Sequence, residues 1–160
     1  MNITILETEY FTVSQCNNCD VPGYLIVACK ENLSSLSDLP REAKYQLGIL
    51  LSDVESSITK VVESEKVYCC KFGEAASIIH FHLFPRTVSL STVFLEFYPE
   101  QKSLIHGPVL FDWARDYYKV ETGCFSSETI VAFNRIKALL NPAGITDKDM
   151  CREADTYPKC

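Results

Sequence analysis

One long stretch of regularly spaced apolar residues constrains the fold of this chain most. Between Pro40 and Val62, apolar side chains recur every three or four residues, at Ala43, Leu47, Leu50, Leu51, Val54, Ile58, Val61 and Val62. Charged side chains occupy the other side, so the spacing predicts an amphipathic helix of about six turns that lies on a sheet. Pro40 suits the first turn of this helix, and Ser37 or Asp38 is a candidate for its cap.

Apolar runs on both sides of this helix predict the sheet. We expect strands over Glu9–Ser14, Tyr24–Cys29, Val67–Lys71, Ile78–Phe84 and Thr92–Tyr98. Helical spacing returns over Pro108–Lys119 and Ser127–Leu140. The pattern predicts one α+β domain over residues 1–145, with a mainly antiparallel sheet, one long helix packed on it and C-terminal helices. Residues 146–160 are polar and punctuated, and we expect a loose tail there.

Bulk composition excludes several classes of function. The chain has 160 residues, 47% hydrophobic and 22% charged, which is ordinary globular composition. A net charge of -6 argues against a nucleic-acid binder, which would carry a basic face. No run approaches the roughly 20 apolar residues of a membrane span, and the N-terminus lacks the pattern of a signal peptide. We therefore expect a cytoplasmic protein with no membrane partner.

Eight cysteines are compatible with disulfides, but without an export signal they are expected to be reduced thiols. Cys16 and Cys19 form a CxxC, which could be half a zinc site or a redox pair. No second CxxC or HxxxH completes a set of about four ligands. The sequence therefore predicts no metal and no cofactor.

Two of the three histidines stand one residue apart in the segment IIHFHLFPR, residues 78–86. In a strand, alternation places His80 and His82 on one face with Ile78 and Phe84, while the residues between them face the core. Two imidazoles on one face can divide labour: one attacks an electrophile, and the other donates a proton or hydrogen bond. Two alternatives are half-exposed sheet histidines with ordinary hydrogen bonds, and a metal chelate to which only His106 could be added.

This segment resembles a known family. Val67–Arg86, with its Phe72-Gly73-Glu74 turn, resembles the active-site strand of the histidine triad (HIT) superfamily of nucleotide hydrolases and transferases, whose motif is His-x-His-x-His and two apolar residues. Upstream, Pro22–Val27 and Lys30–Leu36 resemble the family's second strand and the entry to its long helix. The resemblance covers about residues 9–90.

The resemblance implies roles for individual residues. His80 matches the histidine that attacks the α-phosphate and holds the nucleotidyl group, and His82 matches the histidine that contacts the phosphate and assists the leaving group. The site residues expected to bind substrate are Gly73 and Glu74 in the turn, Ser77 through its hydroxyl, and Lys71, which with Arg86 could offset phosphate charge.

The departures from the family pattern concern zinc. Ile78 replaces the first histidine of the triad, and Asn32 replaces a histidine at the helix entry. In members with zinc, those two histidines join a CxxC, whereas Cys16 and Cys19 lie in a different place. Both histidines needed for chemistry remain while those needed for zinc are gone, which fits a zinc-free hydrolase.

The leading hypothesis is a nucleotide hydrolase or transferase that cleaves a phosphoanhydride or phosphoramidate at the α-phosphate through a nucleotidyl-histidine. The diadenosine polyphosphate hydrolases are the nearest class. The alternative is a catalytically weak HIT-fold module that binds a nucleotide or a protein. The resemblance also implies a two-fold homodimer. Trp113, Tyr117 and Tyr118 are expected in the core, unless their segment covers the pocket and offers an aromatic ring to a purine.

Overall fold

The structure is a computed structural model that describes residues 2–74 and 76–141. Its centre is one antiparallel sheet of five strands in the order β1-β2-β3-β5-β4. The strands are β1 (Thr4–Glu7), β2 (Phe11–Gln15), β3 (Leu25–Cys29), β4 (Lys66–Cys70) and β5 (His80–Arg86). The α-helices are α1 (Arg41–Val62), α2 (Val88–Phe97), α3 (Gly107–Tyr117) and α4 (Ser127–Leu140). The predicted α+β class is confirmed.

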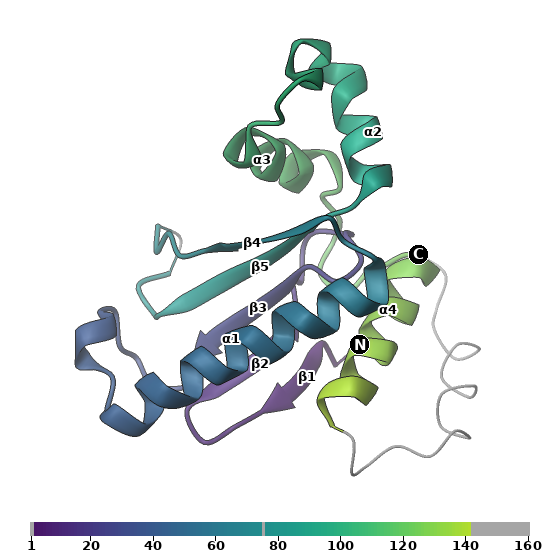
Figure 1. Cartoon of the computed structure of the whole chain (residues 1–160). Coiled ribbons are helices and arrows are strands. Elements are labelled where there is room, and N and C mark those ends of the chain that lie inside the picture. Colours follow the sequence, from purple (N-terminus) through teal and green to yellow (C-terminus); the bar gives the residue numbers. More distant parts are fainter. Residues whose placement is uncertain (1, 75, 142–160) are drawn as a thin grey trace.

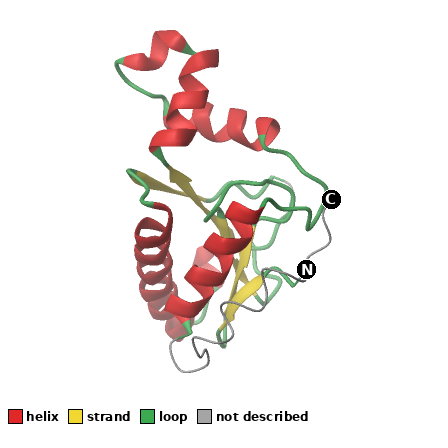
Figure 2. Ribbon diagram, turned by 90° about the vertical axis from the view of Figure 1, so that its right-hand side faces the viewer, coloured by secondary structure: helices red, strands yellow, loops and turns green. Residues whose placement is uncertain are grey.

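The helices fall into two groups. Figures 1 and 2 show α1 and α4 side by side on one face of the sheet, and α2 with α3 beyond one end of it. The main core lies under the first group, where Leu50, Val54 and Ile58 of α1 pack with sheet residues and with Phe133 and Ile136 of α4. A second, smaller core joins the opposite face of the sheet to α2 and α3. The sheet is therefore buried on one face and partly covered on the other.

The predicted cap of α1 is wrong. Pro40 itself is the N-cap residue of α1, and its side chain makes no capping bond. Ser37 and Asp38 belong instead to a separate 3₁₀ turn, Leu36–Asp38, which Ser35 caps by accepting a hydrogen bond from the Ser37 N–H. The helix ends as predicted, and Glu63 follows it in the left-handed region with φ of 50°.

The strand predicted over Thr92–Tyr98 is also wrong, because Thr92–Phe97 belong to α2 and Tyr98 caps its C-terminus, before a 3₁₀ turn (Pro99–Lys102). The Thr87 hydroxyl accepts a hydrogen bond from the Leu90 N–H and starts the helix. Leu90 and Phe94, four residues apart, are buried together in the second core. Packing of this helical face outweighs the strand preference of the β-branched residues between them.

Two further differences concern the ends of the chain. The N-terminal strand β1 pairs with β2 and was absent from the prediction, which placed the first strand over Glu9–Ser14. The predicted tail, residues 146–160, and the domain limit at residue 145 lie outside the described residues. Within residues 2–74 and 76–141, no helix combines the length and the apolar character needed to cross a bilayer.

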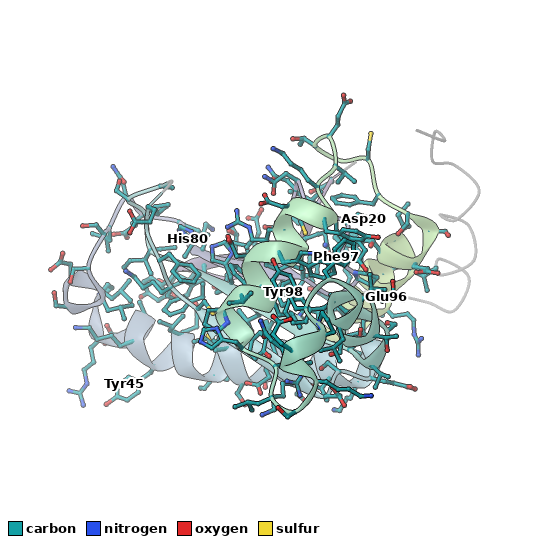
Figure 3. The ribbon with its side chains drawn as sticks, turned by 90° about the horizontal axis from the view of Figure 1, so that it is seen from above. Asp20, Tyr45, His80, Glu96, Phe97 and Tyr98 are labelled. Atoms are coloured by element: carbon teal, nitrogen blue, oxygen red, sulfur yellow. The ribbon has the colours of Figure 1, made fainter. Side chains whose placement is uncertain are left out.

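The structure contains one chain, so the expected homodimer stays a prediction. Leu47, Leu50 and Val54 of α1 are buried in the main core. The exposed apolar side chains of α1 are Tyr45 and Ile49, and Tyr45 projects from the outer side of the helix (Figure 3).

Candidate active site

The two histidines stand on β5, which lies between β3 and β4 inside the sheet. The predicted alternation is confirmed: Leu83 belongs to the main core, whereas His80 and His82 line a cavity on the other face. Ile78 differs from the prediction, because it precedes the strand and packs on the main core instead of standing beside the histidines. Ile78, which occupies the position of the family's first histidine, therefore does not line the cavity.

His80 is held by a backbone carbonyl. Its Nδ1 lies 2.9 Å from the carbonyl oxygen of Ile78. A carbonyl oxygen only accepts hydrogen bonds, so Nδ1 carries a hydrogen, and in the neutral ring Nε2 keeps its lone pair. The ring stands 5.0 Å from the ring of His82, with 74° between the two planes. The main chain thus sets the tautomer of the His80 ring, and Nε2 is the nitrogen that can act as a nucleophile.

His82 lies deeper, with only 9% of its surface exposed. Its Nδ1 is 2.8 Å from the Tyr24 hydroxyl, and the rings of Phe72 and Phe111 lie 6.0 and 5.7 Å away. Burial, followed by the electrostatic interactions with His80 and Arg115, lowers the pKa of His82 to about 4. His82 is therefore a neutral imidazole at neutral pH.

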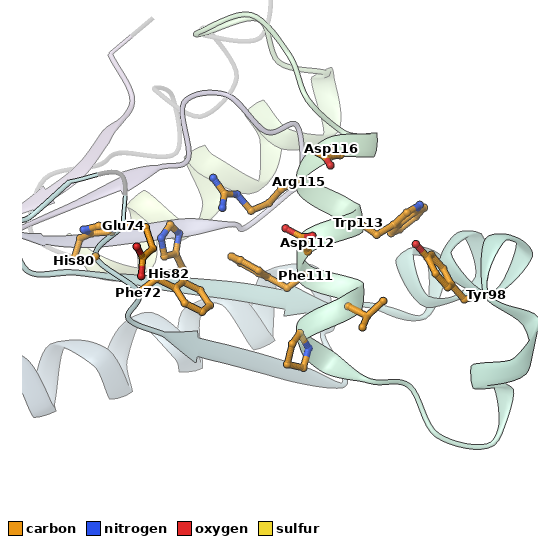
Figure 4. A pocket seen from close by; sticks show the side chains of 13 residues that line it. Phe72, Glu74, His80, His82, Tyr98, Phe111, Asp112, Trp113, Arg115 and Asp116 are labelled. Atoms are coloured by element: carbon orange, nitrogen blue, oxygen red, sulfur yellow. The ribbon is translucent and has the colours of Figure 1, made fainter.

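The histidine cavity, as we call the hollow in front of this pair, has a volume of about 650 Å³. Its walls are His80 and His82, the turn Phe72-Gly73-Glu74, Tyr98 and one side of α3 (Figure 4). This volume is in the range of small-molecule sites. The segment after residue 90 therefore covers the site, and Trp113 lines the cavity while the ring of Tyr117 stacks on it at 4.8 Å.

The residues expected to bind substrate divide into two groups. Gly73 and Glu74 line the histidine cavity, and Gly73 has φ of 90°, a conformation that favours glycine. Lys71 instead lines a neighbouring hollow beside β4, and Ser77 is exposed and belongs to neither wall. Arg86 forms an ion pair with Glu65 at 3.4 Å, outside the histidine cavity.

The cation that the structure places in the histidine cavity is Arg115 of α3. Figure 4 shows its side chain reaching from α3 toward His82, and its guanidinium carbon lies 5.5 Å from the centre of the Phe111 ring. Three carboxylates, those of Glu74, Asp112 and Asp116, line the same cavity. The helix that carries Arg115 was predicted, but no local signal indicated that it would pack over the histidine strand.

Solved histidine triad proteins superpose on most of this chain. A hypothetical histidine triad nucleotide-binding protein from Sulfolobus tokodaii strain 7 aligns with a TM-score of 0.57 and 11% identity, over 88% of this chain and 84% of its own. A HIT-like protein involved in cell-cycle regulation from Bartonella henselae aligns with a TM-score of 0.55 and 15% identity, over 86% of each chain. The chain has the histidine triad fold.

The histidine triad fold is also shared with a zinc-bound histidine triad family protein from Mycobacterium smegmatis, at a TM-score of 0.53 and 16% identity, over 88% of this chain and 84% of that one. The match to the Caenorhabditis elegans NitFhit protein, at a TM-score of 0.49 and 20% identity, spans 54% of this chain and 22% of that one. No protein-family model matches the sequence, and no curated protein does. The three matches with a TM-score above 0.5 confirm, for the fold, the resemblance to the histidine triad superfamily.

Within this histidine triad fold, the CxxC lies buried beneath α3. The Cys16 Sγ is 3.3 Å from Asn18 Oδ1, and the Cys19 Sγ is 3.8 Å from the carbonyl oxygen of Ala114. Burial raises the pKa of Cys19 to about 12, which opposes the thiolate that a metal requires. In the part of the chain that the structure describes, no three His, Cys, Asp or Glu side chains are grouped to hold a metal ion.

The low pKa of His82 predicts that the stability of this domain depends on pH. The unfolded chain binds a proton at this residue near pH 6.5, but the native chain does so only near pH 4. The unfolded state therefore holds more protons in this window, and the free energy of unfolding falls as the pH falls. We expect His82 to account for a loss of about 2 kcal/mol between pH 7.5 and pH 5, measured by urea denaturation.

The matched variants are His82→Gln, which removes this titration, and His106→Gln, which changes an exposed histidine. His82→Gln should flatten the pH dependence by that amount, and His106→Gln should keep it. An equal pH dependence in wild type and His82→Gln would show that His82 titrates normally.

Proposed function

We propose that this protein is a nucleotide hydrolase or transferase that cleaves a phosphoanhydride, phosphoramidate or similar bond at the α-phosphate through a nucleotidyl-His80 intermediate. The observation that carries the proposal is the hydrogen bond from His80 Nδ1 to the Ile78 carbonyl at 2.9 Å. It leaves the Nε2 lone pair free on a residue that lines a cavity of suitable size. The nucleophile is thus prepared without the first histidine of the family motif.

The reaction has two displacements at phosphorus. In the first, the His80 Nε2 lone pair forms a bond to the α-phosphorus, and the leaving group departs with the electrons of its bond, taking a proton from water when it is an amine. The ring becomes cationic, and the Ile78 carbonyl stabilises it by accepting from Nδ1. In the second, a water oxygen bonds to phosphorus and releases a proton, the N–P electrons return to Nε2, and the nucleotide leaves.

Arg115 and His82 supply the groups that stabilise charge on the phosphate oxygens. Arg115 is a permanent cation in the histidine cavity, and guanidinium groups bind phosphate oxygens in pairs. His82 is neutral at neutral pH, because burial and nearby positive charge lower its pKa. We therefore assign it an N–H hydrogen bond to a phosphate oxygen rather than proton donation to the leaving group.

This assignment predicts how turnover depends on the leaving group. Without a strong general acid, wild-type turnover should fall steeply as the leaving group becomes less acidic, so that phosphoanhydrides react faster than phosphoramidates. His82→Ala should lower turnover by about 10²-fold for every leaving group, which is the loss expected from one donor to a phosphate oxygen. The measurement is a series of adenosine 5′-phosphate esters and amidates of graded leaving-group acidity near pH 7.5. A deficit that shrinks for acidic leaving groups would instead identify His82 as a general acid.

A catalytically weak nucleotide-binding module is the second candidate. The observation in its favour is the charge of the histidine cavity, where one guanidinium faces three carboxylates, a poor setting for a polyphosphate. The decisive experiment incubates the protein with a fluorogenic adenosine phosphoramidate and a panel of dinucleoside polyphosphates. An enzyme releases product and shows a covalent adduct by mass spectrometry, whereas a module binds these compounds and releases them intact.

A further inference from the structure

Tyr24 lies directly behind the deeper histidine. It precedes β3, follows a turn through Gly23, and is completely buried. Its ring packs edge-on against Phe84 and Phe111, at 5.1 and 6.0 Å between ring centres. The hydroxyl lies 2.8 Å from His82 Nδ1. The phenol therefore has a fixed position and one short contact with the site.

The direction of this hydrogen bond follows from the surroundings of the phenol. Burial raises the pKa of Tyr24, so the hydroxyl keeps its hydrogen and must donate it. The other nearby acceptor is the sulfur of Cys16, whose own thiol is bonded to Asn18 Oδ1 at 3.3 Å. Sulfur is a weak acceptor and an imidazole nitrogen is a good one. The Tyr24 hydrogen therefore points to His82 Nδ1.

A neutral imidazole that accepts at Nδ1 carries its hydrogen on Nε2. His80 has the opposite arrangement, because its Nδ1 donates to the Ile78 carbonyl. We propose that Tyr24 is a positioning residue that fixes the Nε2–H tautomer of His82, so that the pair offers phosphate one lone pair and one N–H. The catalytic consequence rests on the proposed function, whereas the tautomers are properties of the free protein.

The tautomers are tested by nitrogen-15 NMR of histidine-labelled protein near pH 7.5, without ligand. With three histidines in the chain, the His80→Ala and His82→Ala spectra assign the signals. We expect His80 as the Nδ1–H form and His82 as the Nε2–H form. Tyr24→Phe should shift His82 toward Nδ1–H and leave His80 unchanged. The matched control is Tyr118→Phe, a partly buried tyrosine whose ring contacts Trp113 and Tyr117.

Turnover provides the second measurement. Tyr24→Phe should lower it by about 10-fold, the equivalent of one neutral hydrogen bond, while Tyr118→Phe should leave it near wild type. In a His82→Ala background, Tyr24→Phe should cause no further loss, because its effect passes through His82. A purely structural role would lower turnover in both backgrounds and would overturn the proposal.

Wild-type protein alone also decides the case if Tyr24→Phe fails to fold. A wild-type His82 in the Nδ1–H form would overturn the proposal, as would an unchanged His82 tautomer in Tyr24→Phe. If no nucleotide is turned over, the proposed function fails, while the NMR result still supports or overturns the assignment of Tyr24.

Discussion

Replacement of His80 by alanine should lower nucleotide turnover by more than about 10³-fold, as expected for loss of a nucleophile. Its Nε2 lone pair is set by the bond from Nδ1 to the Ile78 carbonyl. His82 is no substitute, because it is more deeply buried and bonded through Nδ1 to Tyr24. In mass spectrometry of rapidly quenched reactions, wild-type protein should gain one nucleotidyl group at His80, and the variant should gain none.

The control for this experiment is His106→Ala. His106 is the exposed N-cap residue of α3, and its side chain makes no capping bond. Turnover by this variant should stay near wild type. Near-wild-type turnover by His80→Ala with an adenosine phosphoramidate would refute the nucleophile assignment, and the strand would then be a binding surface.

Replacement of Arg115 by glutamine should lower kcat/KM by about 10²- to 10³-fold, because it removes the cation that lines the histidine cavity. Three carboxylates line the same cavity, so the variant should repel an anionic substrate. The same substitution should raise the pKa of His82, since the positive charge of Arg115 helps to lower it. Steady-state kinetics and an NMR titration of His82 measure the two effects.

Arg135→Gln is the matched control, because it removes an exposed guanidinium from α4, on the other side of the sheet. It should change neither kcat/KM nor the His82 titration. Lys71→Gln provides a second comparison, because Lys71 lines the neighbouring hollow. A larger loss with Lys71→Gln than with Arg115→Gln would show that the phosphate binds beside β4 instead.

Local patterns in the sequence predicted the elements that are periodic. The long helix α1 and the strand β5 repeat apolar residues at intervals that only one kind of backbone can satisfy. The strand expected over Thr92–Tyr98 failed because its composition suits both structures, and contact with α3 decides between them. Burial by a distant segment is invisible to a local pattern.

The site residues also divide into those that a local pattern predicts and those that depend on distant segments. His80 and His82 are adjacent on one strand, so their spacing was enough to pair them. Two further residues reach His82 from distant segments. Tyr24 lies 58 positions before His82 in the chain, and Arg115 lies 33 positions after it. No spacing rule connects positions so far apart. Pairing of β3 with β5 brings Tyr24 to His82, and packing of α3 over the sheet brings Arg115 there.

Because β5 alternates between the core and the cavity, its seven residues contribute both to the stability of the fold and to the candidate site. Leu83 contributes to the main core, whereas its neighbour His82 faces the cavity. An insertion or deletion of one residue just before His80 would exchange the two faces and turn both histidines toward the apolar interior. A change in the length of this strand would therefore disrupt both the core and the candidate site. On the proposed function, substrate preference can change without moving the nucleophile, because α3 lies on another segment and can exchange its side chains independently of β5.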